Sequence, residues 1–133
     1  MQPSAQQESH DGGRSLHEPS EVGACIQACL ESARRSQQAR SYAESRGGRL
    51  AEPTLLGVLQ DCAECCATSA RWLQRGSAFI SEQCSLCATV CKTCEDFCAQ
   101  HPGDATLQAC AEACRRSFDL CLRMGRAAGA LGQ

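Results

Sequence analysis

The stretch CSLCATVCKTCEDFC, residues 84–98, decides the fold of this chain because its five cysteines recur at alternating spacings of three and four residues. Residues three and four positions apart lie on one face of an α-helix, so the five thiols are expected to form a single stripe. A bundle helix normally carries leucine along such a stripe. Cysteine is smaller than leucine and its thiolate binds metals, so the stripe predicts a metal-binding interior.

The same spacing continues outside this stretch, in a chain that holds 13 cysteines in 133 residues. Five cysteine pairs are four residues apart, which places their two thiols one helical turn from each other. These pairs are Cys25/Cys29, Cys62/Cys66, Cys87/Cys91, Cys94/Cys98 and Cys110/Cys114. Cysteines therefore follow a helical period along most of the chain.

Signals for helix starts and ends divide the chain into four helices joined by short turns. Pro19 and Pro53 suit the first turn of a helix, and the glycines at 47–48 and 76 suit helix ends. The segment HPGD at 101–104 predicts a turn whose last residue, an aspartate, caps the fourth helix.

Each predicted helix carries an inward stripe of small or apolar residues, and Ser77 is expected to cap the third helix with almost no loop. We therefore predict an all-α fold, an antiparallel up-down-up-down four-helix bundle with a cysteine-lined core. Besides cysteines, the expected inward residues are Val22, Ser32, Ser36, Ala39, Ala43, Leu55, Val58 or Leu59, Ser69, Leu73, Ile80, Leu107, Ser117 and Met124.

The length of the chain is typical of one domain, which we place at residues 19–128. Residues 1–18 are polar and lack a period, so we expect a disordered tail, and we expect a flexible C-terminus at 129–133. His10 and His17 in the tail either capture metal or are simply solvated.

Composition argues against several classes of function. A net charge of -2, with no basic run beside aromatic residues, argues against nucleic-acid binding. No apolar run approaches the roughly 20 residues of a membrane span, and residues 1–20 lack a secretory signal. We therefore expect a cytoplasmic, reducing setting. Disulfides are disfavoured because thiols along one helix run side by side and converge poorly for an S–S bond.

Spacing and charge favour Cu(I) as the metal. One ion can bridge two thiols a helical turn apart, an arrangement of soft, two-coordinate thiolates that suits Cu(I) better than tetrahedral Zn(II). One Cu(I) per thiolate also leaves a buried core close to neutral. We expect on the order of one Cu(I) per core cysteine, about ten or more ions in total. Catalytic thiol chemistry is weakly supported, so no enzyme is predicted.

Two other interpretations stay open. The bundle is alternatively a metal-responsive interaction module, with one or two tight sites and an exposed apolar face for a partner. It is alternatively a zinc or iron–sulfur protein with few metal sites. Against iron–sulfur binding, the cysteines keep a helical period throughout, whereas ferredoxin cysteines lie on loops.

The chain closely resembles the copper storage proteins, a family of cysteine-rich four-helix bundles. The resemblance runs over about residues 24–125 and is strongest in DCAECCATSARWLQRGSAFISEQCSLCATVCKTCEDFCAQH (61–101) and ACAEACRRSFDLCLRMG (109–125). It implies intracellular storage and sequestration of multiple Cu(I) ions on cysteine thiolates inside the bundle, and a homotetramer. The candidate metal ligands are Cys25, Cys29, Cys62, Cys65, Cys66, Cys84, Cys87, Cys91, Cys94, Cys98, Cys110, Cys114, Cys121 and His101.

Some of these residues depart from the family pattern or keep two interpretations. Cys65 does not match the pattern and is expected to face a neighbouring helix or the rim. His101 is either a copper ligand at one mouth of the bundle or a histidine favoured by the helix dipole. Met124, expected at the opposite end, is either a soft copper ligand or a plug of the core. Serines at inward positions are poor Cu(I) ligands, so copper capacity should be lower than in members with more cysteines.

Overall fold

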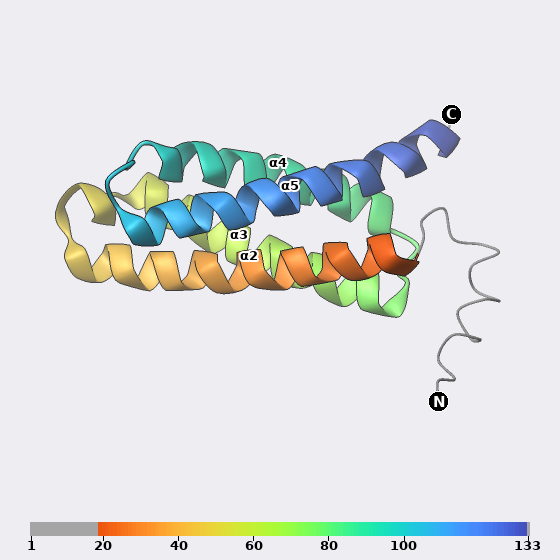
Figure 1. Cartoon of the computed structure of the whole chain (residues 1–133), viewed down its shortest axis with the longest axis horizontal. Helices are drawn as coiled ribbons and strands as arrows, with labels where there is room; N and C mark the ends of the chain where they lie inside the picture. Colours follow the sequence, from red (N-terminus) through yellow and green to blue (C-terminus); the bar gives the residue numbers. More distant parts are fainter. Residues whose placement is uncertain (1–18, 133) are drawn as a thin grey trace.

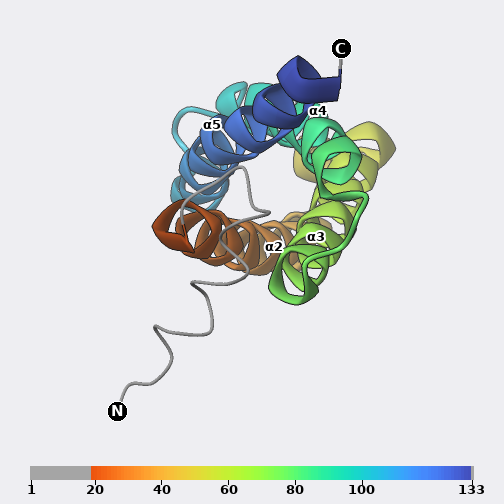
Figure 2. The same ribbon diagram turned by 90° about the vertical axis from the view of Figure 1, so that its right-hand side faces the viewer.

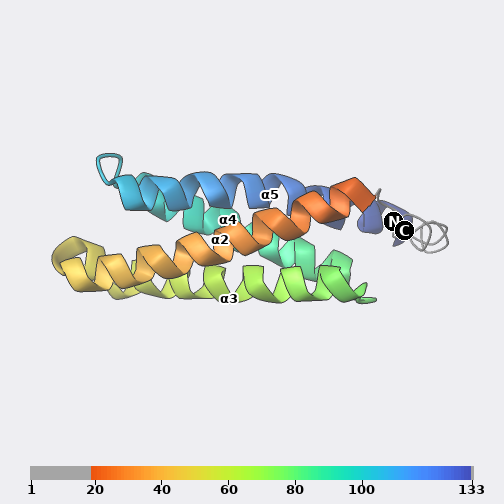
Figure 3. The same ribbon diagram turned by 60° about the horizontal axis from the view of Figure 1, so that its bottom comes forward.

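A computed structural model of the protein describes residues 19–132. This part of the chain forms four long helices, namely α2 (Pro19–Arg46), α3 (Pro53–Arg75), α4 (Ile80–Ala99) and α5 (Ala105–Gly132). A short 3-10 helix, η1 (Gly48–Ala51), connects α2 to α3. Successive helices run in opposite directions along one long axis (Figures 1 and 3). The predicted antiparallel four-helix bundle is confirmed.

Each helix contacts its two neighbours around a common axis, as the view along the bundle shows (Figure 2). The start of α2, the α3–α4 turn and α5 beyond Met124 lie at one end of the bundle (Figure 1). The segment η1 and the α4–α5 turn, which contains His101, lie at the other end. His101 and Met124 therefore lie at opposite ends, as expected.

Helix boundaries follow the predicted signals at α2 and α3. Gly47 and Gly48 have φ angles of 73° and 61°, a left-handed conformation that glycine adopts at little cost, and they end α2. Pro53 occupies the first turn of α3, where its missing N–H leaves no hydrogen bond unmade. Gly76, at φ 68° and ψ 44°, ends α3 with its N–H bonded to the Leu73 carbonyl.

The prediction that Ser77 caps the third helix is wrong. Helix α4 begins at Ile80, and its N-cap is Phe79. The Ser77 hydroxyl instead accepts a hydrogen bond from the Phe79 N–H at 3.1 Å, and the Ser77 carbonyl accepts one from Ile80 at 3.3 Å. A serine side chain can hydrogen-bond to a nearby backbone group either in a turn or in a helix cap. Here the Ser77 hydroxyl stabilises the turn between α3 and α4.

Most of the expected inward residues are buried, but Val22 and Ile80, which lie close to helix ends, are only half-buried. Among alternative positions, Leu59 is buried while Val58 is half-buried, and Cys66 is buried while Cys65 is half-buried. Serine and alanine make up much of the α2 stripe, so the core next to that helix has little side-chain volume. The other buried residues of the expected stripes are Ser32, Ser36, Ala39, Ala43, Leu55, Ser69, Leu73, Leu107, Ser117 and Met124.

The predicted domain limits stay predictions. Helix α5 continues to Gly132, past residue 128. The expected tail at 1–18, with His10 and His17, lies outside the described residues. Among the helices described, none combines the length and the apolar character that crossing a membrane requires.

Asp104 connects the fourth helix to the first. Its carboxylate accepts hydrogen bonds from the Leu107 N–H at 3.0 Å, which makes it the predicted N-cap of α5, and from the Tyr42 hydroxyl at 2.6 Å. Burial acts to raise the pKa of Asp104, but the hydrogen bonds from Tyr42 and from backbone N–H groups lower it overall. The ionised carboxylate therefore favours the folded state, and this contribution is lost as the pH falls through that lowered pKa.

We expect Asp104→Ala to lower the free energy of unfolding by about 1 kcal/mol, because α5 loses its cap. Urea denaturation of the metal-free protein under reducing conditions measures this change. Asp104→Asn is the matched control, since it keeps an oxygen for the Leu107 N–H and should lose less. Equal losses in the two variants would show that the cap is not the source of the effect.

Candidate metal centre

All thirteen cysteines lie in the described part of the chain and carry free thiols. Twelve are buried, with no exposed surface, and only Cys65 is partly exposed. The interior of the bundle is therefore lined by sulfur along much of its length. Thiols at such density are unusual for a core, because they pack less apolar volume than leucine.

Four groups of three cysteines bring their sulfur atoms within 4.8 Å of one another. Each group draws its thiols from more than one helix, so only the folded bundle forms it. All of their members are buried. The groups are Cys25/Cys29/Cys121, Cys62/Cys94/Cys114, Cys62/Cys66/Cys91 and Cys94/Cys98/Cys110.

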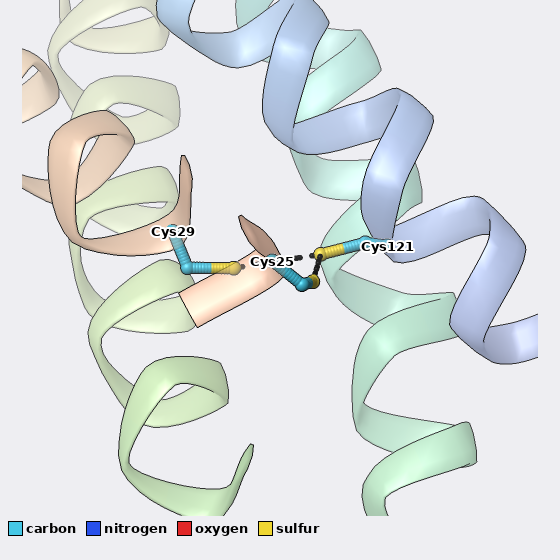
Figure 4. A group of neighbouring side chains, drawn as sticks. All are labelled: Cys25, Cys29 and Cys121. Carbon is cyan, nitrogen blue, oxygen red and sulfur yellow. Dashed lines mark hydrogen bonds between the residues drawn. The ribbon is translucent and has the colours of Figure 1, made fainter. Parts of the chain in front are cut away.

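The first group lies near the end of the bundle where α2 starts. Cys25 and Cys29 extend from α2 toward Cys121 of α5, as Figure 4 shows. The sulfur of Cys121 lies 3.7 Å from that of Cys25 and 3.5 Å from that of Cys29. Two helices thus supply ligands to one point in space.

The other three groups lie between α3, α4 and α5. The sulfur of Cys66 lies 3.4 Å from that of Cys91, and the sulfur of Cys62 lies 3.6 Å from that of Cys114. Cys87 connects this region onward, with its sulfur 3.7 Å from that of Cys66 and 3.9 Å from that of Cys91. The thiols therefore form a network and not a set of isolated pairs.

Pairs one turn apart on a helix are close enough to share a metal ion. The sulfur separations are 3.9 Å for Cys62 and Cys66 and 4.0 Å for Cys110 and Cys114. Two metal–sulfur bonds of about 2.3 Å span roughly 4.6 Å end to end, so a small outward shift of each thiol makes room for one ion.

Serine hydroxyls interrupt the sulfur network on the α2 side. Ser32 Oγ lies 3.6 Å from the sulfur of Cys114 and 3.8 Å from that of Cys62, and it accepts a hydrogen bond from Cys66 at 3.4 Å. Ser36 Oγ lies 3.5 Å from the sulfur of Cys110. The helical period of the sequence places these serines inward, but their contacts depend on how the helices pack.

Hydrogen bonding within the network makes some thiols more acidic. Neighbouring thiols, Cys114 foremost, lower the pKa of Cys62 and of Cys110. The contact with Cys25 raises the pKa of Cys121, but hydrogen bonds from three other thiols lower it to about 6. These three sulfurs are the positions at which a thiolate is best stabilised before metal binds.

Most other buried thiols hold their protons more tightly. Cys87 has a raised pKa chiefly because it donates to Cys121 and other sulfurs, and burial away from water adds to this effect. The hydrogen bond with Cys110 is the main cause of the raised pKa of Cys94. Raised pKa values are found at Cys25, Cys84, Cys87, Cys91, Cys94, Cys98 and Cys114.

These shifts predict how the stability of the metal-free protein depends on pH. An unfolded thiol ionises near pH 8.5, whereas most core thiols stay neutral above that pH. A raised folded-state pKa stabilises the fold below the unfolded pKa, and that stability is lost as the pH rises. We expect the free energy of unfolding, measured with urea and a reductant, to fall between about pH 8 and 10. Copper-loaded protein is the control, because metal-bound thiolates should not show this loss. A free energy of unfolding that rises with pH in both forms would contradict the raised pKa values of the core thiols.

His101 and Met124 occupy the two ends of the network. His101 is half-buried in the α4–α5 turn and lines a surface pocket of about 690 Å³ together with Arg49, Glu52 and Pro53. Met124 is only 2% exposed, which fits a plug of the core as well as a soft ligand. Whether either side chain binds metal stays a prediction.

Cys65 lies on the side of α3 that faces α4, as expected for a cysteine outside the stripe. Gln83 of α4 reaches it, with Nε2 at 3.5 Å from the Cys65 sulfur, 3.3 Å from the Cys65 carbonyl oxygen and 3.0 Å from Ser69 Oγ. The hydrogen bond with Cys87 is the main cause of the lowered pKa of Cys65. Nothing in its spacing sets Gln83 apart from other polar residues of the helix, so this contact was not predicted from the sequence.

The fold and this interior define a class of protein, a four-helix bundle whose core is a network of buried thiols suited to several soft metal ions. The chain belongs to the copper storage protein family, whose model matches residues 17–126. Members of this family are metal storage proteins.

Similar proteins agree with this assignment. The "Uncharacterized cysteine-rich protein YhjQ" of Bacillus subtilis (strain 168) is 30% identical over 101 residues, which are 76% of this chain and 93% of YhjQ. The Cu(I)-bound copper storage protein BsCsp3 superposes with a TM-score of 0.75 and 28% identity, over 79% of this chain and 98% of BsCsp3.

A Streptomyces lividans protein, described as a cytosolic copper storage protein and solved with five coppers, has a TM-score of 0.69 and 29% identity. The match covers 80% of this chain and 93% of the other. The same Streptomyces lividans protein has been solved loaded with 10 copper equivalents.

Proposed function

We propose that this protein stores and sequesters multiple Cu(I) ions on cysteine thiolates inside its bundle. The observation that carries the proposal is the set of four buried groups of three cysteines, each with sulfur atoms within 4.8 Å of one another. Buried thiolates are soft ligands, and Cu(I) is the soft ion that accepts two or three of them without a tetrahedral cage.

The thirteen cysteines are the proposed ligands, and His101 is a further candidate at one end. Twelve buried cysteines support a stoichiometry on the order of one Cu(I) per core thiol, because each added ion then cancels the charge of one thiolate. Zinc in the same groups would leave net negative charge in a core that contains no buried cation among the described side chains.

Several finer statements belong to the same proposal. The copper is cargo and not a catalytic group, so we propose no enzymatic turnover. We propose a cytoplasmic location, supported by the description of the Streptomyces lividans relative as cytosolic. We also propose a homotetramer, supported by the resemblance of the chain to its family, and no role for nucleic acid or membranes.

Anaerobic titration of the reduced, metal-free protein with Cu(I) against a chromogenic chelator tests the proposal. We expect about ten or more equivalents to be withheld from the chelator, because most core thiols have sulfur neighbours at bridging distance. Parallel titration with Zn(II) and metal analysis of freshly purified protein are the controls. One or two tight equivalents would support a metal-responsive interaction module, and colour with visible absorbance would support an iron–sulfur protein.

Copper capacity should respond to a single change at Ser32, whose hydroxyl lies among three thiols. Replacing it with cysteine converts that position into a soft ligand, so Ser32→Cys is expected to withhold about one more equivalent of Cu(I). Ser32→Ala is the matched control and should leave the capacity unchanged. A capacity that is the same in all three proteins would place the copper elsewhere in the bundle.

A further inference from the structure

A glutamine of α5 holds the last turn of α4. Gln108 is half-buried, and its side-chain Nε2 donates hydrogen bonds to the carbonyl oxygen of Cys98 at 3.2 Å and to that of His101 at 2.9 Å. Cys98 lies one residue before the end of α4, and His101 lies in the turn that follows. One side-chain amide therefore fixes the backbone of α4 and of the α4–α5 turn against α5.

The end of α4 needs this partner, because the last carbonyls of a helix have none within the helix. Helix α3 ends at Gly76, whose left-handed conformation turns its N–H back to a carbonyl of the last turn. Helix α4 ends at Gln100 with φ −73° and ψ −4°, which is right-handed. Besides Gln108, the Cys98 carbonyl is bonded by the His101 N–H at 3.1 Å, a contact within the same turn. A helix end held only by bonds within its own turn frays easily.

The turn that Gln108 holds carries a candidate copper ligand. Cys98 forms one of the buried groups of three with Cys94 and Cys110, in which the sulfur atoms lie within 4.8 Å of one another. Cys94 belongs to α4 as well, whereas Cys110 belongs to α5 and follows Gln108 by two residues. The group therefore closes only while the end of α4 keeps its position against α5. Gln108 makes that connection beside both helices' ligands.

We propose that Gln108 is a positioning residue for Cu(I), which holds the Cys98 carbonyl so that the Cys98 thiol completes the group with Cys94 and Cys110. This inference rests on the proposed storage function and assigns a determinant of copper affinity within it. Gln108 is not a ligand, and it acts through the backbone of Cys98. Because its hydrogen bonds order the helix end before copper arrives, metal binding does not have to supply that order.

Removal of the amide donor tests this role. Gln108→Leu keeps a good helix former but cannot donate a hydrogen bond. We expect one equivalent of Cu(I) to bind about tenfold more weakly, because the metal then has to order the helix end itself. Anaerobic competition of the copper-loaded full chain with increasing chromogenic chelator measures this change. N-ethylmaleimide labelling with peptide mass mapping should find Cys98 modified at a chelator concentration that leaves it protected in the wild-type protein.

Gln83→Leu is the matched control. Gln83 is also half-buried, and its Nε2 also reaches a neighbouring helix, with the Cys65 carbonyl oxygen at 3.3 Å and Ser69 Oγ at 3.0 Å. Cys65 lies outside the four groups of three, so Cys98 should stay protected in this variant. Gln108→Lys should restore protection, because its ammonium can donate to the same carbonyls at a helix end that favours a cation.

A double variant separates positioning from general support of the bundle. Cys98→Ser removes the ligand directly, so adding Gln108→Leu to it should cost no further copper affinity if Gln108 acts through Cys98. Additive losses, unchanged copper retention in Gln108→Leu, or equal exposure of Cys98 in Gln83→Leu would each overturn the proposal. Only one or two tight equivalents in the wild-type protein would instead overturn storage itself, so the two failures are distinguishable.

Gln108→Glu decides the question if Gln108→Leu lacks the circular dichroism of a helical protein. Glutamate has nearly the shape of glutamine, and its ionised carboxylate cannot donate a hydrogen bond to a carbonyl. We expect the same early labelling of Cys98 by N-ethylmaleimide during competition with the chelator. Protection of Cys98 equal to that in the wild-type protein would overturn the proposal.

Discussion

Packing of four helices around a column of thiols is the constraint on which this structure depends. A bundle normally gains its stability from large apolar side chains that interdigitate across the axis. Here the equivalent positions hold cysteine, serine and alanine over most of the length, with leucine concentrated near the His101 end. The smaller residues give up burial and dispersion energy, so metal bound only by the folded state adds stability that the core itself does not supply.

Other features of the fold compensate for this weak core at the places where helices meet. Asp104 caps α5 and also accepts a hydrogen bond from Tyr42 of α2, which joins the first and last helices away from the thiols. Gly125 of α5 allows close approach to α4, since a Cβ at this position would lie 2.2 Å from Ser85 Oγ. These contacts hold the helices in register, and that register brings sulfur atoms from different helices within bridging distance of one another.

The thiol network combines two properties that copper storage requires. Hydrogen bonds to neighbouring sulfurs raise the pKa of many core thiols, and burial adds to this effect, so the metal-free interior holds mostly neutral groups and avoids an accumulation of negative charge. A few thiols, such as Cys62 and Cys110, have lowered pKa values because their neighbours donate hydrogen bonds to them. Copper binding can begin at these thiolates and continue outward, with each ion replacing a proton.

The sequence by itself determined the helical fold, because cysteines at three- and four-residue spacings can share a face only on a helix, and proline, glycine and Asp104 mark where helices start and end. It also determined which residues face inward, since Ser32, Ser36 and Met124 follow the same period as the cysteines. It did not determine the start of α4, where the Ser77 hydroxyl serves a turn and not a cap. Only the tertiary structure decided which thiols meet, such as Cys25 with Cys121, and that Gln83 lies against Cys65. Those contacts depend on how whole helices are rotated and shifted relative to one another, and local spacing in the sequence does not specify this.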